Sequence, residues 1–161
     1  NSGADKISVN TPAIENPILI NELAKSFGSQ CVTVGIDSMQ ERGQYIVYSK
    51  TGNVNTSFNT KILTKDWIIK VQELGAGEIV LNCMNQDGVK RGFDIKQLNY
   101  MSDVINVPLI ASGGAGKEID FFNVLNNPKI SGALAASVFH NSEIQIEDLK
   151  NFLKQNNIHI R

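Results

Sequence analysis

A glycine-rich segment follows one of the apolar runs of the sequence and has the composition of a phosphate-binding loop. Ala111–Gly116 reads ASGGAG, directly after the run Pro108–Ser112 and before a stretch with helical spacing. Glycines such as Gly113 and Gly114 let backbone N–H groups approach a phosphate closely, and the start of a following helix adds a favourable dipole. The same composition also fits a plain tight turn.

A second group of small residues ends the next apolar run. Ala135, Ala136 and Ser137 stand there in sequence, so the two alanines leave space and the Ser137 hydroxyl offers a hydrogen bond. Parallel strands that are neighbours would bring both groups to one edge of a sheet, which is where barrel enzymes often hold a phosphate. The two segments together therefore predict a phosphate site.

A third group combines amide, hydroxyl and carboxyl side chains at the ends of two other apolar runs. Asn10 and Thr11 end one run and Asp37 ends the next. Asn and Thr are suited to a second phosphate or a sugar hydroxyl, and a carboxylate facing the same space can act as a general acid or base. The alternative for Asp37 is a structural role, capping a turn.

The elements that must position these residues alternate regularly along the chain. The predicted strands are Lys6–Asn10, Cys31–Asp37, Glu78–Asn82, Pro108–Ser112 and Gly132–Ser137. Stretches of helical spacing follow them, and a hairpin-like excursion over residues 42–59 precedes a helix that Thr64 is expected to cap. Apolar strands joined by helices are typical of a parallel sheet, so the class is α/β, either doubly wound or a barrel.

The period of a strand favours the barrel. Residues two apart share a face, so Lys6 lies on the same side of its strand as Asn10, and Glu78 on the same side as Asn82. Helices on both faces would bury these charges without partners, which is costly. In a barrel, Lys6 and Glu78 can instead meet at the bottom rim.

Composition limits the possibilities. The chain has 161 residues, a formal charge of −1 and 42% hydrophobic residues, which excludes disordered, collagen-like and disulfide-scaffold classes and fits one domain or part of one. The charge gives no broad reason to expect nucleic acid or membrane as a partner. The opening residues lack a signal-peptide profile, so we expect a cytoplasmic protein, with Cys31 and Cys83 as reduced core thiols.

Six segments carry a resemblance that runs essentially from end to end. They are GADKISVNTPAI, FGSQCVTVGID, LGAGEIVLNCMNQDGVKRGFD, VPLIASGGAG, GALAASVFH and LKNFLKQNNIHIR. The chain resembles the cyclase subunit family of imidazole glycerol phosphate synthase, in histidine biosynthesis. The resemblance implies a (β/α)8 TIM barrel of which residues 1–161 are the C-terminal part of a single domain, with only strands four to eight and their helices.

The resemblance also implies a reaction. Ammonia and the phosphoribulosyl-formimino carboxamide nucleotide become imidazole glycerol phosphate and aminoimidazole carboxamide ribotide. Asp37 matches one of two catalytic aspartates, the other lying on strand one. The implied substrate and phosphate contacts are Asn10, Thr11, Asn82, Asp87, Ser112, Gly113, Gly114, Ala136 and Ser137. Asn82 stands where many members of the family have Thr.

A partner is implied too. Family members take ammonia from a glutaminase docked on the bottom of the barrel. Lys6 and Glu78 match two members of the charged gate, and Asp5 matches a position near the docking surface. None of the motifs calls for a metal or an organic cofactor.

Three alternatives remain open. The sister sugar-phosphate isomerase of the same pathway and a cyclase serving polysaccharide amidation share the fold, although the NQDG segment and the IHIR ending favour the histidine cyclase. A phosphate-binding piece without activity is the third, because an open parallel sheet exposes unpaired edges. Lys90 and Arg91 either attract a phosphorylated substrate or lie in a solvated loop. His140, at the expected strand end beside the phosphate site, could contact that site, although a structural role or a surface hydrogen bond is favoured.

Overall fold

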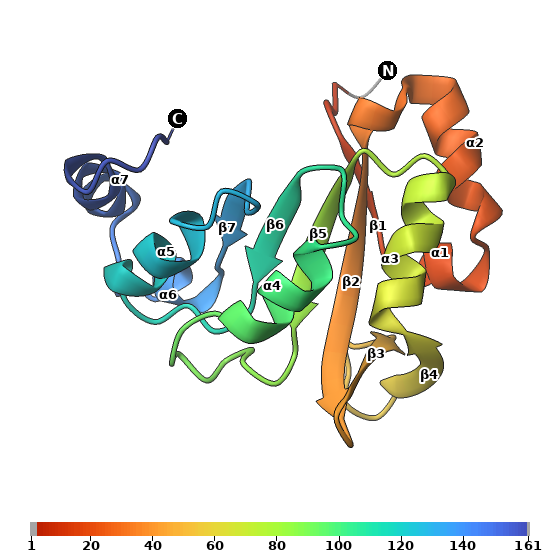
Figure 1. The fold of residues 1–161 in the computed structure, drawn as a ribbon, viewed down its shortest axis with the longest axis horizontal. Coiled ribbons are helices and arrows are strands. Elements are labelled where there is room, and N and C mark those ends of the chain that lie inside the picture. Colours follow the sequence, from red (N-terminus) through yellow and green to blue (C-terminus); the bar gives the residue numbers. More distant parts are fainter. Residues whose placement is uncertain (1–2, 161) are drawn as a thin grey trace.

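A seven-stranded sheet forms the centre of the computed structural model, which describes residues 3–160 (Figure 1). The strands are β1 (Ile7–Val9), β2 (Val32–Glu41), β3 (Gln44–Ser49), β4 (Phe58–Leu63), β5 (Glu78–Cys83), β6 (Leu109–Ser112) and β7 (Gly132–Leu134). The helices are α1 (Thr11–Glu15), α2 (Ile18–Phe27), α3 (Thr64–Glu73), α4 (Ile95–Ser102), α5 (Glu118–Leu125), α6 (Ser137–His140) and α7 (Ile146–Gln155).

Five of the strands run parallel. β1 pairs with β2, β2 with β5, β5 with β6, and β6 with β7. These are the five predicted strands, in the order in which they follow one another along the chain. The α/β class with a mostly parallel sheet is therefore confirmed.

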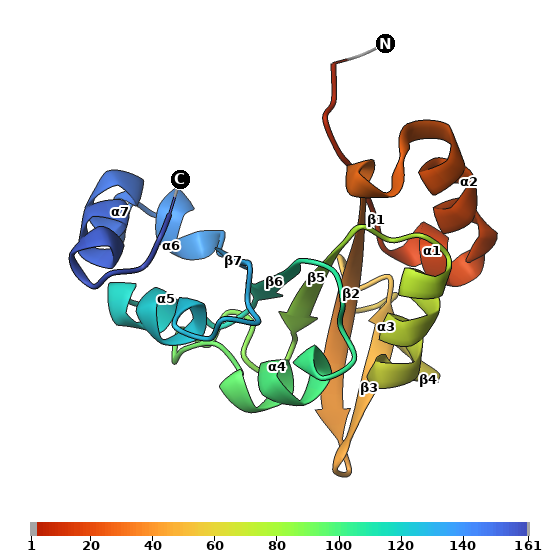
Figure 2. The ribbon, with the colours of Figure 1, turned by 45° about the horizontal axis from the view of Figure 1, so that its top comes forward.

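β2 is the longest strand and carries the excursion predicted over residues 42–59. Its first residues pair with β1, whereas its last residues, from Asp37 onward, pair with the antiparallel β3. β4 continues this antiparallel arm. The arm projects beyond the parallel strands on the side where their carboxyl ends lie (Figures 1 and 2).

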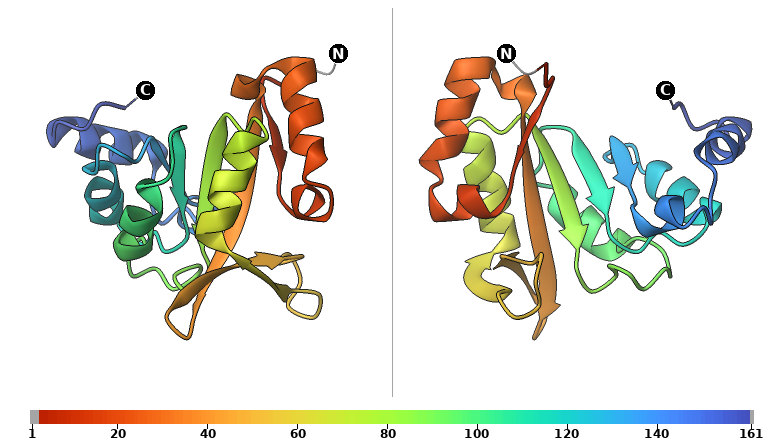
Figure 3. Two further views of the ribbon diagram at one scale, coloured as in Figure 1. Left: turned by 45° about the vertical axis from the view of Figure 1, so that its right-hand side comes forward. Right: turned by 180° about the vertical axis from the view of Figure 1, so that it is seen from behind.

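The hydrophobic core lies on the side of the sheet that the helices cover. In β5, Ile79, Leu81 and Cys83 are buried, while Glu78, Val80 and Asn82, on the other face, stay partly exposed. Figure 3 shows α3, α4 and α5 on one side of the curved sheet. The buried side chains of these helices include Trp67, Ile68, Val71, Leu98, Met101, Phe121 and Val124. Trp67 and Phe121 are thus core residues, and Phe122 packs against that core half-buried.

Thr64 does not cap α3 as predicted. It is the first residue of the helix, and its hydroxyl is buried 2.7 Å from the hydroxyl of Ser38 in β2. Gln97 of α4 donates to the same Ser38 oxygen. This buried polar network uses the Thr64 hydroxyl to tie α3 to the sheet, so it is not free to cap the helix.

Several predicted boundaries are wrong. β2 runs beyond its expected end at Asp37, to Glu41. The strand expected over Gly132–Ser137 ends at Leu134, because the backbone turns into the helical region at Ala136, whose carbonyl accepts from Phe139 and His140. His140 therefore lies in α6. Cys31 belongs to a single 3₁₀ turn and is half-buried, so only Cys83 is a core thiol.

The sheet is open. Among residues 3–160, the outer strands β1 and β7 each have one hydrogen-bonded neighbour, β2 and β6 respectively. No helix within that range combines the length and the apolarity needed to cross a bilayer.

Candidate active site

Asp37 is held by three side chains that come from different parts of the chain. Asn10 Nδ2 donates to Oδ2 at 2.8 Å, Asn82 Nδ2 donates to Oδ1 at 2.8 Å, and Thr51 Oγ1 donates to Oδ2 at 2.6 Å. Asp37 is only 7% exposed. A buried carboxylate with donors on both oxygens is fixed in orientation, as an acid–base group needs to be.

The parallel register explains why these residues meet. Asp37 and Asn82 are directly paired in β2 and β5, so their side chains leave the sheet on the same face. Val9 pairs with Val34, so Asn10, which directly follows β1, lies at the same end of the sheet and its side chain reaches Asp37. The predicted grouping of Asn10 with Asp37 is therefore found, whereas the contact of Asn82 with Asp37 was not predicted.

Thr51 was missed by the sequence interpretation. It follows β3, and Asp37 pairs with Tyr48 of that strand, so the antiparallel arm returns the chain over the carboxylate. The available signal was the turn that follows QYIVYS. It predicts a hairpin but does not show which strand the hairpin covers.

Thr11 also contacts the antiparallel arm. Its hydroxyl oxygen accepts from the Lys50 backbone N–H at 3.0 Å and lies 3.3 Å from the Ser49 hydroxyl. Residues 49–51 thereby touch both Thr11 and Asp37. The structure brings Asn10, Thr11 and Asp37 together, as predicted.

A cavity of about 330 Å³ lies next to Asn82. Its lining comes from the ends of β5, β6 and β7 and the segments that follow them: Asn82, Asp87, Gly88, Ser112, Gly113, Gly114, Ala115, Leu134, Ala135, Ala136 and Ser137. The lining includes Gly113, Gly114, Ala136 and Ser137, the residues predicted for the phosphate site formed by the glycine-rich segment and the small residues that follow the next strand. Ser112 Oγ lies 3.3 Å from Asn82 Oδ1, so this cavity borders directly on the Asp37 cluster.

The glycines of this cavity are required by geometry. Gly113 and Gly114 have φ values of 91° and 106°, which side chains rarely allow. A Cβ on Gly114 would lie 2.1 Å from the Gly92 carbonyl oxygen, and one on Gly113 would lie 2.8 Å from the Cys83 carbonyl oxygen. The segment is therefore a tightly packed loop, and at Gly113 and Gly114 it can present only backbone to the cavity.

Charged residues meet at the opposite end of the strands. Lys6 Nζ lies 2.6 Å from Glu78 Oε2, and Thr33 Oγ1 donates to Glu78 Oε1 at 2.9 Å. The Glu78 side chain is 17% exposed and that of Lys6 52%. The predicted pairing of Lys6 with Glu78 is confirmed. Asp5 lies just before β1 and is exposed.

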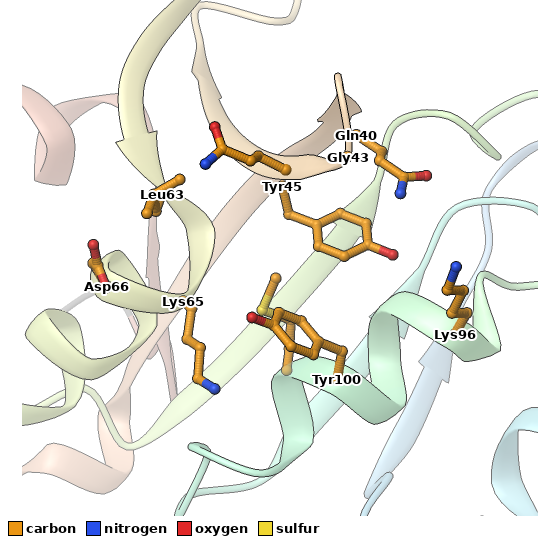
Figure 4. Close-up of a pocket in the computed structure, with 10 residues that line it drawn as sticks. Gln40, Gly43, Tyr45, Leu63, Lys65, Asp66, Lys96 and Tyr100 are labelled. Atoms are coloured by element: carbon orange, nitrogen blue, oxygen red, sulfur yellow. The ribbon is translucent and has the colours of Figure 1, made fainter.

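Another cavity, of about 510 Å³, lies on the helix-covered side (Figure 4). The rings of Tyr45 and Tyr100 are 5.9 Å apart there, and Lys65 Nζ lies 4.9 Å from the Tyr100 ring centre. Burial raises the pKa of Tyr45, and Asp94 adds to this. None of the residues predicted for catalysis or phosphate lines this cavity.

Comparison with known proteins places this arrangement in a family. Residues 1–145 match the model of the histidine biosynthesis protein family. The chain belongs to this family. The resemblance to a histidine biosynthesis family is thereby confirmed.

Relatives of this histidine biosynthesis protein are similar over nearly its whole length. It is 55% identical to imidazole glycerol phosphate synthase subunit HisF of Pseudoalteromonas translucida and 54% identical to that of Photobacterium profundum, each over 161 residues. It is 56% identical to the same subunit of Buchnera aphidicola over 162 residues. In each case 99% of the chain is covered but only 63% of the relative. The chain thus spans less than two thirds of the length of these relatives.

Proposed function

We propose that residues 1–161 form strands four to eight of a (β/α)8 barrel and belong to a cyclase subunit of imidazole glycerol phosphate synthase. Two findings support this assignment: the five parallel strands in sequential order, and identities of about 55% to HisF subunits over 63% of their length. The observation that carries it is the joint placement of Asp37, Asn10 and Asn82 beside the glycine-lined cavity.

The proposed reaction joins ammonia to the formimino carboxamide nucleotide and releases imidazole glycerol phosphate, aminoimidazole carboxamide ribotide and one water, which carries away the ketose carbonyl oxygen. Closing the imidazole ring moves protons between nitrogen and carbon atoms, and a fixed carboxylate can take up or return them. Asp37 fills this role in the proposal. The substrate spans the carboxyl ends of the strands, with one phosphate at Asn10 and Thr11 and the other in the cavity formed by Gly113, Gly114, Ala136 and Ser137.

The test is Asp37→Asn in the whole encoded protein. The amide cannot exchange a proton as the carboxylate does, so ammonium-dependent cyclisation should be abolished. Substrate affinity should stay within about tenfold, or roughly 1.4 kcal/mol, because the phosphate contacts remain. Asp66→Asn, which changes an exposed carboxylate in the first turn of α3, is the matched control. Retained cyclisation in Asp37→Asn would exclude this residue from the chemistry.

The proposal includes a glutaminase partner at the amino ends of the strands. The pair of Lys6 with Glu78 supports it, since oppositely charged side chains lie there on the inner face, with Asp5 exposed close by. The proposal places the protein in the cytoplasm and requires neither a metal nor an organic cofactor. Mixing the protein with the separately purified glutaminase should give a complex by gel filtration, and the absence of a complex would count against this partner.

A further inference from the structure

Lys90 and Glu143 connect two loops that are far apart in sequence. Lys90 lies between β5 and α4, in the segment that carries Asp87, and Glu143 lies between α6 and α7. The Lys90 ammonium donates to Glu143 Oε1, and Asn141 Nδ2 donates to the same oxygen at 3.0 Å. The ion pair thus joins the loop after β5 to the segment after β7.

The loop that carries Lys90 also rests on the glycine-rich loop. The Gly92 N–H donates to the Gly114 carbonyl at 2.8 Å. A Cβ on Gly116 would lie 2.4 Å from the Lys90 carbonyl oxygen, so the two backbones are in direct contact. Backbone packing thus holds the Lys90 loop against the glycine-rich loop. The Lys90 side chain reaches the segment after β7, which carries Glu143.

These three segments are the ones that line the 330 Å³ cavity. Asp87 and Gly88 come from the first, Gly113 and Gly114 from the second, and Ser137 from the third. The Lys90–Glu143 pair therefore closes a ring of contacts around the cavity. This pair contributes its contact through two long side chains, whereas the Lys90 loop and the glycine-rich loop touch through their backbones.

We propose that Lys90 and Glu143 form a clamp that keeps the Asp87 loop closed over a phosphate bound in this cavity. The inference rests on the proposed function, because it takes the cavity to be a phosphate site. In it, Lys90 is a positioning residue and does not bind the phosphate itself. Breaking the clamp lets the loop open and shortens the time for which the phosphate stays bound.

The charges of the pair distinguish a clamp from a direct ligand. Lys90 lowers the pKa of the Glu143 carboxyl by its hydrogen bond, and Asn141 lowers it further. The carboxylate is therefore ionised at neutral pH and offsets the Lys90 charge. If Lys90 bound phosphate directly, removing the Glu143 charge would tighten phosphate binding. If the pair is a clamp, removing either charge weakens phosphate binding.

The experiment is a calorimetric titration of the whole protein with inorganic phosphate. Lys90→Met and Glu143→Gln should weaken phosphate binding by a similar factor, about two- to fivefold, as expected for a partly exposed ion pair. The double variant should be no weaker than either single variant. The reversed pair, Lys90→Glu with Glu143→Lys, should recover at least half of the loss. With substrate, KM should rise by the same factor while kcat changes less than twofold.

The matched control is another exposed ion pair, which joins Asp103, just after α4, to Lys129, between α5 and β7. Lys129 Nζ lies 2.8 Å from Asp103 Oδ1, and neither residue lines the cavity. Lys129→Met and Asp103→Asn should leave phosphate binding unchanged. A general effect of surface charge would move the control variants as well, and this would overturn the clamp.

Other outcomes are equally decisive. Tighter binding in Glu143→Gln together with weaker binding in Lys90→Met would make Lys90 a ligand and overturn the clamp, as would unchanged binding in both. No binding of phosphate by the unaltered protein would overturn the clamp and the phosphate site together. The expected phosphate pattern in a protein that does not cyclise the nucleotide would support the clamp and overturn only the proposed function.

Discussion

At the scale of single residues, the environment of Asp37 determines what it can do. Two amides and one hydroxyl donate to its oxygens, and each comes from a different segment. Hydrogen bonds to an ionised group are stronger than those between neutral groups. The orientation of the carboxylate therefore depends on all three donors.

Thr51→Val tests the donor that comes from the antiparallel arm. The substitution keeps the shape but removes the hydrogen bond to Asp37 Oδ2, so we expect kcat/KM for ammonium-dependent cyclisation to fall about tenfold. Thr51→Ser retains a hydroxyl and should lose less than threefold. Equal losses in the two variants would show that the hydroxyl does not act on Asp37.

The two cysteines should differ in reactivity. Burial raises the pKa of the Cys83 thiol, with a smaller contribution from Asp94, whereas Cys31 is half-buried. Because the thiolate is the reactive form, iodoacetamide at pH 8 should modify Cys31 in the folded protein and Cys83 only after unfolding. Peptide mass spectrometry measures both sites.

The raised pKa also means that Cys83 favours folding at neutral pH and that this contribution declines as pH rises above about 8.5.

Site residues on strands were predictable, and those on loops were predictable only in part. Asn10, Asp37 and Asn82 come together because the strand period is two and because the parallel register sets the ends of neighbouring strands side by side. Thr51 and Glu143 contribute through loops whose paths depend on tertiary packing. Neither has a local sequence pattern that names its partner, so neither was predicted.

At the scale of elements, the glycine-rich loop is the part of the site least tolerant of change. Gly114→Ala would place a Cβ 2.1 Å from the Gly92 carbonyl oxygen at a φ of 106°. Strain of this kind costs on the order of 1–3 kcal/mol, so we expect a lower melting temperature and phosphate binding weakened at least tenfold. Thermal unfolding and phosphate titration measure the two effects.

Gly52→Ala is the control for that substitution. Gly52 lies in the β3–β4 turn, and an added Cβ would meet nothing within 4 Å. Its melting temperature should match that of the unaltered protein within about 2 °C, as expected for a surface change that removes no contact. Should both variants lose stability equally, the close packing of Gly114 would not be the cause.

The elements themselves were largely predictable because each strand is an apolar run between helical stretches. All five parallel strands form at the predicted places, in the predicted order. The errors lie at boundaries. The stretch ending in Ser137 looks like one strand by composition, but Ala136 has helical backbone angles, with φ −117° and ψ −66°, and α6 begins at the next residue. Hydrophobic period does not report such a turn.

At the scale of the whole molecule, the open sheet sets the behaviour of the 161-residue chain by itself. β1 and β7 each present an edge that has no partner among residues 3–160, and unpaired edges favour pairing with other chains. We expect the isolated chain to form dimers or larger species whose share rises with protein concentration. Sedimentation velocity measures this distribution. A monomer at all concentrations would show that these edges are protected.

The position of Asn82 has a consequence for any attempt to redesign this protein. One side chain both steadies the carboxylate and forms part of the wall of the neighbouring cavity. A library randomised at this codon should therefore yield clones in which turnover and ligand affinity change together. To change turnover alone, Thr51 is the position to vary, because it contacts Asp37. To change ligand affinity alone, Ser137 is the position to vary, because it lines the cavity.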